Sequence, residues 1–154
     1  MVVFRRDGTN KMNREPIYSA LFALVSNTIG IVTSSRRAKA FADISAGQQP
    51  ALYMEQKSEQ QDVTTKMPGK WTMNVDLLVY VATGGNDPNV IPASILNPIL
   101  DGICAKLVPP SPLGEQTLGG LVARCRIHGA IEIVEGVQGD QAMAVIPVVI
   151  FTPD

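Results

Sequence analysis

The chain is poor in the residues that build catalytic and metal centres. It has one histidine, His128, and two cysteines, Cys104 and Cys125, which are far apart in the sequence. A zinc site takes about four His or Cys ligands in close groups. A Ser-His-Asp or Cys-His mechanism would have to use His128, and no Gly-x-Ser-x-Gly elbow is present. We therefore expect no catalytic residue, no metal and no cofactor, and two reduced, buried cysteines.

Net charge, aromatic residues and long apolar runs are also scarce. A formal charge of −1 gives no whole-chain footprint for nucleic acid or an anionic membrane, and aromatics make up only 5%. No segment approaches the roughly 20 apolar residues of a membrane span. Basic residues precede the apolar run 17–25, as in a signal peptide, but Glu15 and Pro16 interrupt the pattern and no small-x-small cleavage site follows. We expect an intracellular protein that makes no membrane contact.

The apolar content of 45% is enough for a core, and 154 residues are most simply one domain. We assign residues 12–154 to that domain and residues 1–11 to a flexible leader. Met12 precedes Asn13-Arg14-Glu15-Pro16, which is typical of a helix start, so Met12 is an alternative initiator.

Two segments have helical spacing. The first runs from Asn13 to about Asn27, where Asn13 is placed to cap and a wide apolar stripe suits packing on a sheet. The second covers about 93–107, where apolar residues recur every four positions.

The strands are recognised by alternation. Residues 35–42 predict an edge strand, 51–55 a short strand, and 71–81 a long central strand. Residues 121–133 alternate between apolar and polar, which predicts one long strand with a dry and a wet face, followed by a buried strand over 142–151. The order α-β-β-β-α-β-β predicts an α+β fold: a mostly antiparallel sheet of about five strands with two helices on one face.

A long polar segment, 56–70, separates two of these strands. It contains few apolar residues and is longer than an ordinary connection. We expect an exposed loop or hairpin arm with a functional role.

The remaining polar residues form two groups. The densest basic cluster is Arg36, Arg37 and Lys39, which is either a solvated edge or a contact for an acidic partner or passing nucleic acid. The wet sheet face is free if both helices cover the other face, so we expect it to pack against another subunit. Its candidate interface residues are Asp76, Tyr80, Arg124, Arg126 and His128.

Nearly all of residues 12–154 resembles the tail terminator (tail completion) proteins of long-tailed bacteriophages. The resemblance rests on these segments: Asn13–Phe22, Ser35-Arg36-Arg37, Gln49–Tyr53, Trp71–Tyr80, Asn97–Asp101, Gln116–Val122, Ile131–Gly136 and Gly139–Ala142. These are diffuse structural signatures and include no catalytic fingerprint.

The resemblance implies a non-enzymatic virion protein, assembled in the host cytoplasm, with an α+β fold. Such proteins form a hexameric ring at the head-proximal end of the tail tube, stop tube growth and present a surface to the head-side connector. Genome DNA passes through the lumen without sequence-specific binding, and sheath protein is a further partner if the tail is contractile. We assign the polar segment to contact with a neighbouring ring through Gln61, Thr64, Lys66, Met67 and Pro68.

The sequence is also compatible with other functions. The chain could be another ring-forming neck or tail-tube protein of the same particle. A small intracellular enzyme would use the polar face around Arg124, Arg126 and His128, and a nucleic-acid binder would use Arg36, Arg37 and Lys39.

Overall fold

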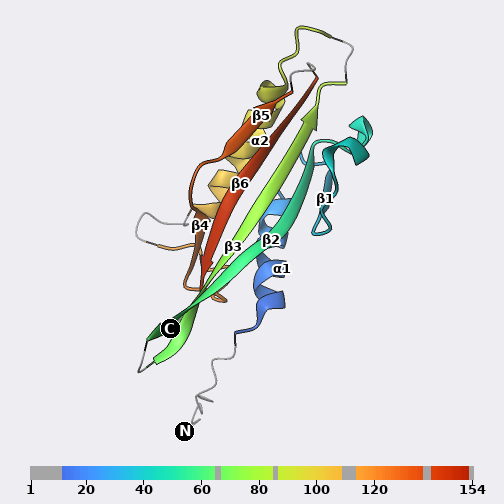
Figure 1. Cartoon of the computed structure of the whole chain (residues 1–154). Coiled ribbons are helices and arrows are strands. Elements are labelled where there is room, and N and C mark those ends of the chain that lie inside the picture. The colour runs from blue at the N-terminus through green and yellow to red at the C-terminus, as the bar shows by residue number, and fades with distance from the viewer. Residues whose placement is uncertain (1–11, 65–66, 85–86, 109–113, 137–139, 153–154) are drawn as a thin grey trace.

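The computed structural model describes residues 12–64, 67–84, 87–108, 114–136 and 140–152. It is a two-layer α+β fold in which two helices lie against one face of a six-stranded sheet (Figure 1). In chain order the elements are α1 Arg14–Ser26, β1 Thr33–Ser35, the 3₁₀ turns η1 Phe41–Asp43 and η2 Ala46–Gln48, β2 Ala51–Thr64, β3 Met67–Ala82, α2 Pro92–Leu107, β4 Arg124–Ile127, β5 Glu132–Glu135 and β6 Gln141–Phe151.

The predicted fold class is confirmed. The sheet order is β1-β2-β3-β6-β4, with β5 also paired to β6, and every pair is antiparallel except β1 with β2. The predicted order of elements holds, with the first strand of the C-terminal pair divided into β4 and β5.

The main core lies between the sheet and both helices. Odd-numbered residues of β3 and even-numbered residues of β6 face the helices because β-strand side chains alternate between faces. The helices contribute Ile17, Leu21 and Val25 from α1, and Leu96 and Ile103 from α2. Asn13 occupies the N-cap position of α1, but its side chain makes no capping hydrogen bond.

The prediction of one unbroken strand over 121–133 is wrong, and Pro147 supplies the reason. The carbonyl oxygen of Pro147 in β6 accepts a hydrogen bond from the amide of His128, so this residue directs its backbone toward β4 and β5. Proline has no N–H to complete the ladder there. The chain leaves the sheet at Gly129, whose φ of +107° favours glycine.

The interruption preserves the predicted alternation. Ile127 pairs with Val148 and Glu132 with Val145, so residues 128–131 lie opposite only 146 and 147. The β4–β5 segment therefore has two more residues than the part of β6 opposite it. Two extra residues leave odd-numbered side chains on the same face of the sheet, whereas one extra residue would move them to the other face. Cys125 is therefore buried on the helix side, as predicted, but Leu121 and Ile133 of the same parity are exposed.

The predicted edge strand 35–42 is also wrong over most of its length. Only Thr33–Ser35 forms a strand, parallel to β2. The following segment turns over the second face of the sheet, where Phe41 packs on Tyr80 and the Tyr80 hydroxyl donates to the carbonyl of Lys39 (3.4 Å). Burial of Phe41 and Ile44 against that face outweighs continued edge pairing.

The polar segment forms the hairpin arm, the second of the two predicted alternatives. The ladder between β3 and β6 starts at Thr72, which pairs with Phe151. Beyond it β2 and β3 continue as two strands alone, through the pairs Gln61 with Trp71, Asp62 with Lys70 and Thr64 with Met67. Figure 1 shows this arm extending past the end of the sheet.

Candidate assembly surface

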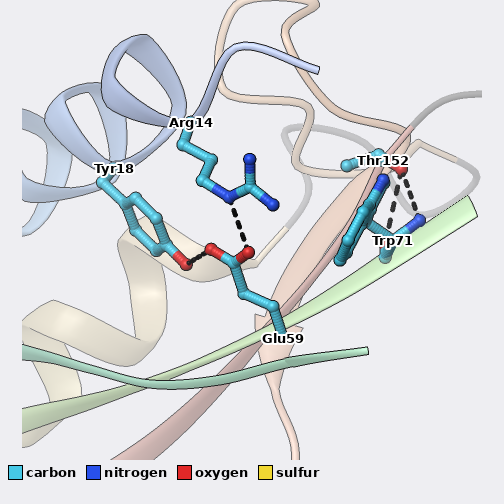
Figure 2. A network of polar contacts seen from close by, with 5 residues as sticks. All are labelled: Arg14, Tyr18, Glu59, Trp71 and Thr152. Carbon is cyan, nitrogen blue, oxygen red and sulfur yellow. Dashed lines mark hydrogen bonds and ion pairs between the residues drawn. The ribbon is translucent and has the colours of Figure 1, made fainter. Parts of the chain in front are cut away.

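A network of polar contacts attaches the base of the arm to the start of α1 (Figure 2). Glu59 of β2 accepts hydrogen bonds from the Arg14 guanidinium (Nε–Oε2, 2.6 Å) and the Tyr18 hydroxyl (2.7 Å). We call Arg14, Tyr18 and Glu59 the Glu59 clamp. It joins α1 to the strand that carries the arm.

Trp71 holds the other strand of the arm. Its amide donates to the Thr152 hydroxyl (2.9 Å), and the Thr152 amide donates to the Trp71 carbonyl (3.0 Å). The guanidinium of Arg14 lies 5.0 Å from the centre of the Trp71 ring, within the range of a cation–π contact. Both strands of the arm are therefore held where they leave the sheet.

These contacts determine the protonation states of Tyr18 and Glu59. Burial raises the pKa of Tyr18, and the adjacent Glu59 carboxylate raises it further, so the hydroxyl keeps its proton and donates. Burial also acts to raise the pKa of Glu59, but the hydrogen bonds from Arg14 and Tyr18 outweigh it and lower the pKa below its ordinary value. Glu59 is consequently a carboxylate at neutral pH.

The predicted contact residues lie on the arm as far as the structure describes it. Gln61 is exposed, and Thr64, Met67 and Pro68 belong to its paired strands. Lys66 lies outside the described residues.

We call the sheet face opposite the helices the open face. Its end nearest η1 is covered by the chain itself: Phe41 and Ile44 pack on Tyr53 and Tyr80, and Tyr80 is only 5% exposed. We predicted a polar, exposed face, but this end of it is apolar and buried. Tyr80 is therefore too buried to contact a partner.

The end nearest the arm base carries two arginines on an aromatic ring. The guanidinium of Arg124 lies 4.3 Å, and that of Arg126 5.7 Å, from the centre of the Phe151 ring. Neither arginine forms an ion pair with any carboxylate in the part of the chain that the structure describes. These two positive charges lie against the ring and have no counter-ion within the described ranges.

Carboxylates gather beside them, toward β2 and β3. Asp76 and Glu55 are cross-strand partners, and the Lys57 ammonium lies 3.2 Å from Glu55 and 3.8 Å from Asp76. Burial raises the pKa of Asp76, Lys57 opposes this rise, and the carboxylates of Glu55 and Glu132 add to it. This region has more negative charge than Lys57 neutralises.

His128 is exposed at the end of β4, and its side chain has no hydrogen-bond or ion-pair partner among the residues described. Among those residues, no serine, cysteine or carboxylate forms with it the hydrogen bond that a nucleophile-base pair would require. Cys125 points to the other face and is buried, which raises the pKa of its thiol to about 12.

The basic cluster is divided by its partners. Arg36 forms an ion pair with Glu15 at the start of α1 and lies 3.3 Å from the Ser19 hydroxyl. The hydrogen bonds from Arg36 and Ser19 lower the pKa of Glu15. Arg37 and Lys39 are exposed, so they alone are available to an acidic partner.

A shallow hollow lies between this cluster and the edge of β2, lined by Glu15, Arg36, Arg37, Ala38, Met54, Glu55 and Gln56. It contains neither a histidine nor a nucleophile. Across the described ranges, no three His, Cys, Asp or Glu side chains meet in a way that could hold a metal ion. Within those same ranges, neither helix has the length and apolarity to cross a membrane.

Sequence reasoning missed Glu59, Trp71 and Phe151 as parts of this surface. Glu59 was one of several polar residues in an apolar-poor segment, and nothing local distinguishes it. Its role depends on α1, which lies 41 residues away at Tyr18. Phe151 is the last residue of an apolar strand, and its two arginine neighbours come from β4.

No known protein family and no curated protein matches the chain. Among solved structures, the chain is similar to one described as the virion of a native gene transfer agent particle. The sequence identity is 13% and the TM-score 0.41, over 88% of this chain and 90% of that one. At that level of similarity, the function has to be argued from the residues of the chain itself.

Proposed function

We propose that this chain is a structural virion protein that caps the head-proximal end of a phage tail tube as a ring. In this role it ends tube growth and offers a surface for joining to the head-side connector. The single observation that supports it best is the open face with its projecting arm: a charged sheet surface at the arm end of the sheet, away from the part covered by η1, beside a braced two-stranded extension.

The open face suits a contact between subunits. Both helices are on the other side of the sheet, so the face near the arm is free for a second copy. Its proposed interface residues are Asp76, Arg124, Arg126 and His128, with Tyr80 withdrawn into the chain's own packing. Repeated head-to-tail contacts of one kind close into a ring when the rotation permits.

The arm suits a contact with the adjacent ring or tube. A two-stranded hairpin without further cover is marginally stable alone, so the Glu59 clamp and Trp71 are needed to hold it in a defined direction. We assign Gln61, Thr64, Lys66, Met67 and Pro68 to this contact. Arg37 and Lys39 are assigned to the connector or to passing DNA, and sheath protein is a further partner in a contractile tail.

The nearest alternative is another ring-forming neck or tail-tube protein of the same particle, because the same face and arm would serve it. A small enzyme is less well supported, because His128 is exposed and, in the described part of the chain, its side chain has no hydrogen-bond partner for proton transfer. A duplex-binding role for the isolated protein would produce strongly salt-dependent binding.

The decisive experiment is electron microscopy of particles made without this protein. We expect tails of uncontrolled, excess length that fail to join heads, because nothing stops tube polymerisation. Tails of normal length that are joined to heads would refute the proposal, and normal length without joining would favour the neck alternative.

The arm is tested by a shortened variant in which residues 62–70 are replaced by an Asn-Gly turn. Two-residue Asn-Gly turns connect antiparallel strands, so Gln61 and Trp71 stay paired and the clamp is retained. We expect the variant to fold and to lose tube capping. A matched control replaces Gln60, which is exposed and pairs with Thr72, with Thr in the full-length arm and should cap normally. Normal capping by the shortened variant would remove the arm from the proposal.

A further inference from the structure

On the open face, Arg124 and Arg126 lie near the arm base, whereas the carboxylates of Glu55, Asp76 and Glu132 lie farther along the sheet. Arg124 and Arg126 lie on β4, at one edge of the sheet, whereas Glu55 and Asp76 lie on β2 and β3. Strand β6 separates the two groups. Asp76 lies two strand spacings from β4, about 10 Å, and Glu55 lies three, about 14 Å. Among the described residues the two groups form no ion pair with each other.

Each group has charge left over. The two guanidiniums have no carboxylate partner among the described residues, and the carboxylates of Glu55 and Asp76 share one ammonium, that of Lys57. Arginine is the side chain best suited to binding carboxylates across an interface, since its planar guanidinium can donate two parallel hydrogen bonds.

The arginines are also ordered before any partner binds. Both stack against Phe151, which restricts their side chains at the surface. Less conformational entropy is then lost when a carboxylate approaches. Between the groups, β6 presents the half-buried Pro147 and Val149, which is 3% exposed.

We infer that Arg124 and Arg126 of one copy pair with Glu55 and Asp76 of the next copy. The occupant of the open face is thus a second copy of this chain, because one copy carries both complementary groups. The basic group is at one sheet edge and the acidic group lies toward the other, which favours a side-by-side, head-to-tail contact. This inference rests on the proposed ring and names the residues that would hold it together.

A charge swap tests the pairing with purified protein. Variant A carries Arg124→Glu and Arg126→Glu, and variant B carries Glu55→Lys and Asp76→Lys. In either variant alone, like charges face each other at every contact. In an equal mixture, each A copy meets B copies with opposite charges on both sides, so alternating assemblies can form. The same substitutions combined in one chain also restore opposite charges.

Association is measured by analytical ultracentrifugation over a range of concentrations and salt, with circular dichroism to check folding. We expect each variant alone to associate about tenfold more weakly than the wild type or worse, and the equal mixture to recover. Recovery excludes misfolding as the cause, since a misfolded chain would not be rescued by mixing. A control with Lys106→Glu reverses a charge on α2, on the other side of the sheet, and should associate like the wild type.

Two results would overturn the inference. One is a wild-type chain that stays monomeric at every concentration tested. The other is a mixture of A and B that associates no better than either alone while the wild type assembles. Neither result depends on tail length, so the proposed function can survive them. Conversely, normal tails in the absence of the protein would refute the function and leave the pairing intact.

Discussion

Removing the Tyr18 hydroxyl tests whether the Glu59 clamp stabilises the fold. Tyr18 is 1% exposed, and its hydroxyl donates to Glu59 at 2.7 Å. A hydrogen bond to a charged group contributes about 1.5–3 kcal/mol. The Glu59 side chain is 22% exposed, so water recovers part of the loss, and we expect Tyr18→Phe to lower the free energy of unfolding by about 1–2 kcal/mol.

The Glu59→Ala variant should cost more, because it leaves the buried Tyr18 hydroxyl without an acceptor as well as removing the bond. Adding Tyr18→Phe to Glu59→Ala should then cost little or restore stability. The stability lost through Tyr18→Phe in the wild type, minus the stability lost through Tyr18→Phe in the Glu59→Ala variant, is the coupling energy of the pair. We expect it to be about 1–2 kcal/mol.

Urea unfolding followed by tryptophan fluorescence is a suitable assay, because Trp71 is the only tryptophan and lies at the arm base beside Arg14. Tyr53→Phe is the matched control: Tyr53 is also 1% exposed, but its hydroxyl makes no side-chain hydrogen bond among the described residues. We expect the control to change stability by about 0.5 kcal/mol or less. An equal cost of Tyr18→Phe with and without Glu59 would refute the clamp.

Three further predictions concern single residues. Gly129→Ala should lower stability by about 1–2 kcal/mol, measured by thermal melting, because φ is +107° there; an unchanged melting temperature would show that the chain adopts another path between β4 and β5. Asp76 has a raised pKa because of burial and the carboxylates of Glu55 and Glu132, against the opposing Lys57. The folded chain then holds this proton more tightly than the unfolded chain, so stability falls as pH rises from about 4 through the raised pKa. Asp76→Asn should flatten that fall in urea titrations at several pH values, and an identical pH profile would contradict it. Cys125, with a buried thiol and a pKa of about 12, should react with a thiol reagent only after unfolding, whereas rapid labelling of both cysteines in the native protein would show that β4 opens readily.

Several elements could be predicted because their signals are local. The alternation over β3 and β6 determines which side chains face the helices, since each strand turns successive residues to opposite sides. The helical spacing of apolar residues similarly predicts the ends of α1 and α2 to within a few residues. The face of the arginines also follows from parity, because Arg124 and Arg126 lie in β4 on either side of Cys125, which is buried on the helix side.

The tertiary structure decided what depends on a distant neighbour. The strand over 121–133 ends at His128 because Pro147 of β6 lies opposite, and the segment after β1 leaves the edge because Tyr80 offers an apolar surface. Glu59 becomes a clamp only when α1 is laid across the sheet. The alternation of side chains is a property of a single strand. The register between strands, and which segments pack over each face of the sheet, depend on contacts between distant parts of the chain. Those contacts form only when the whole chain folds.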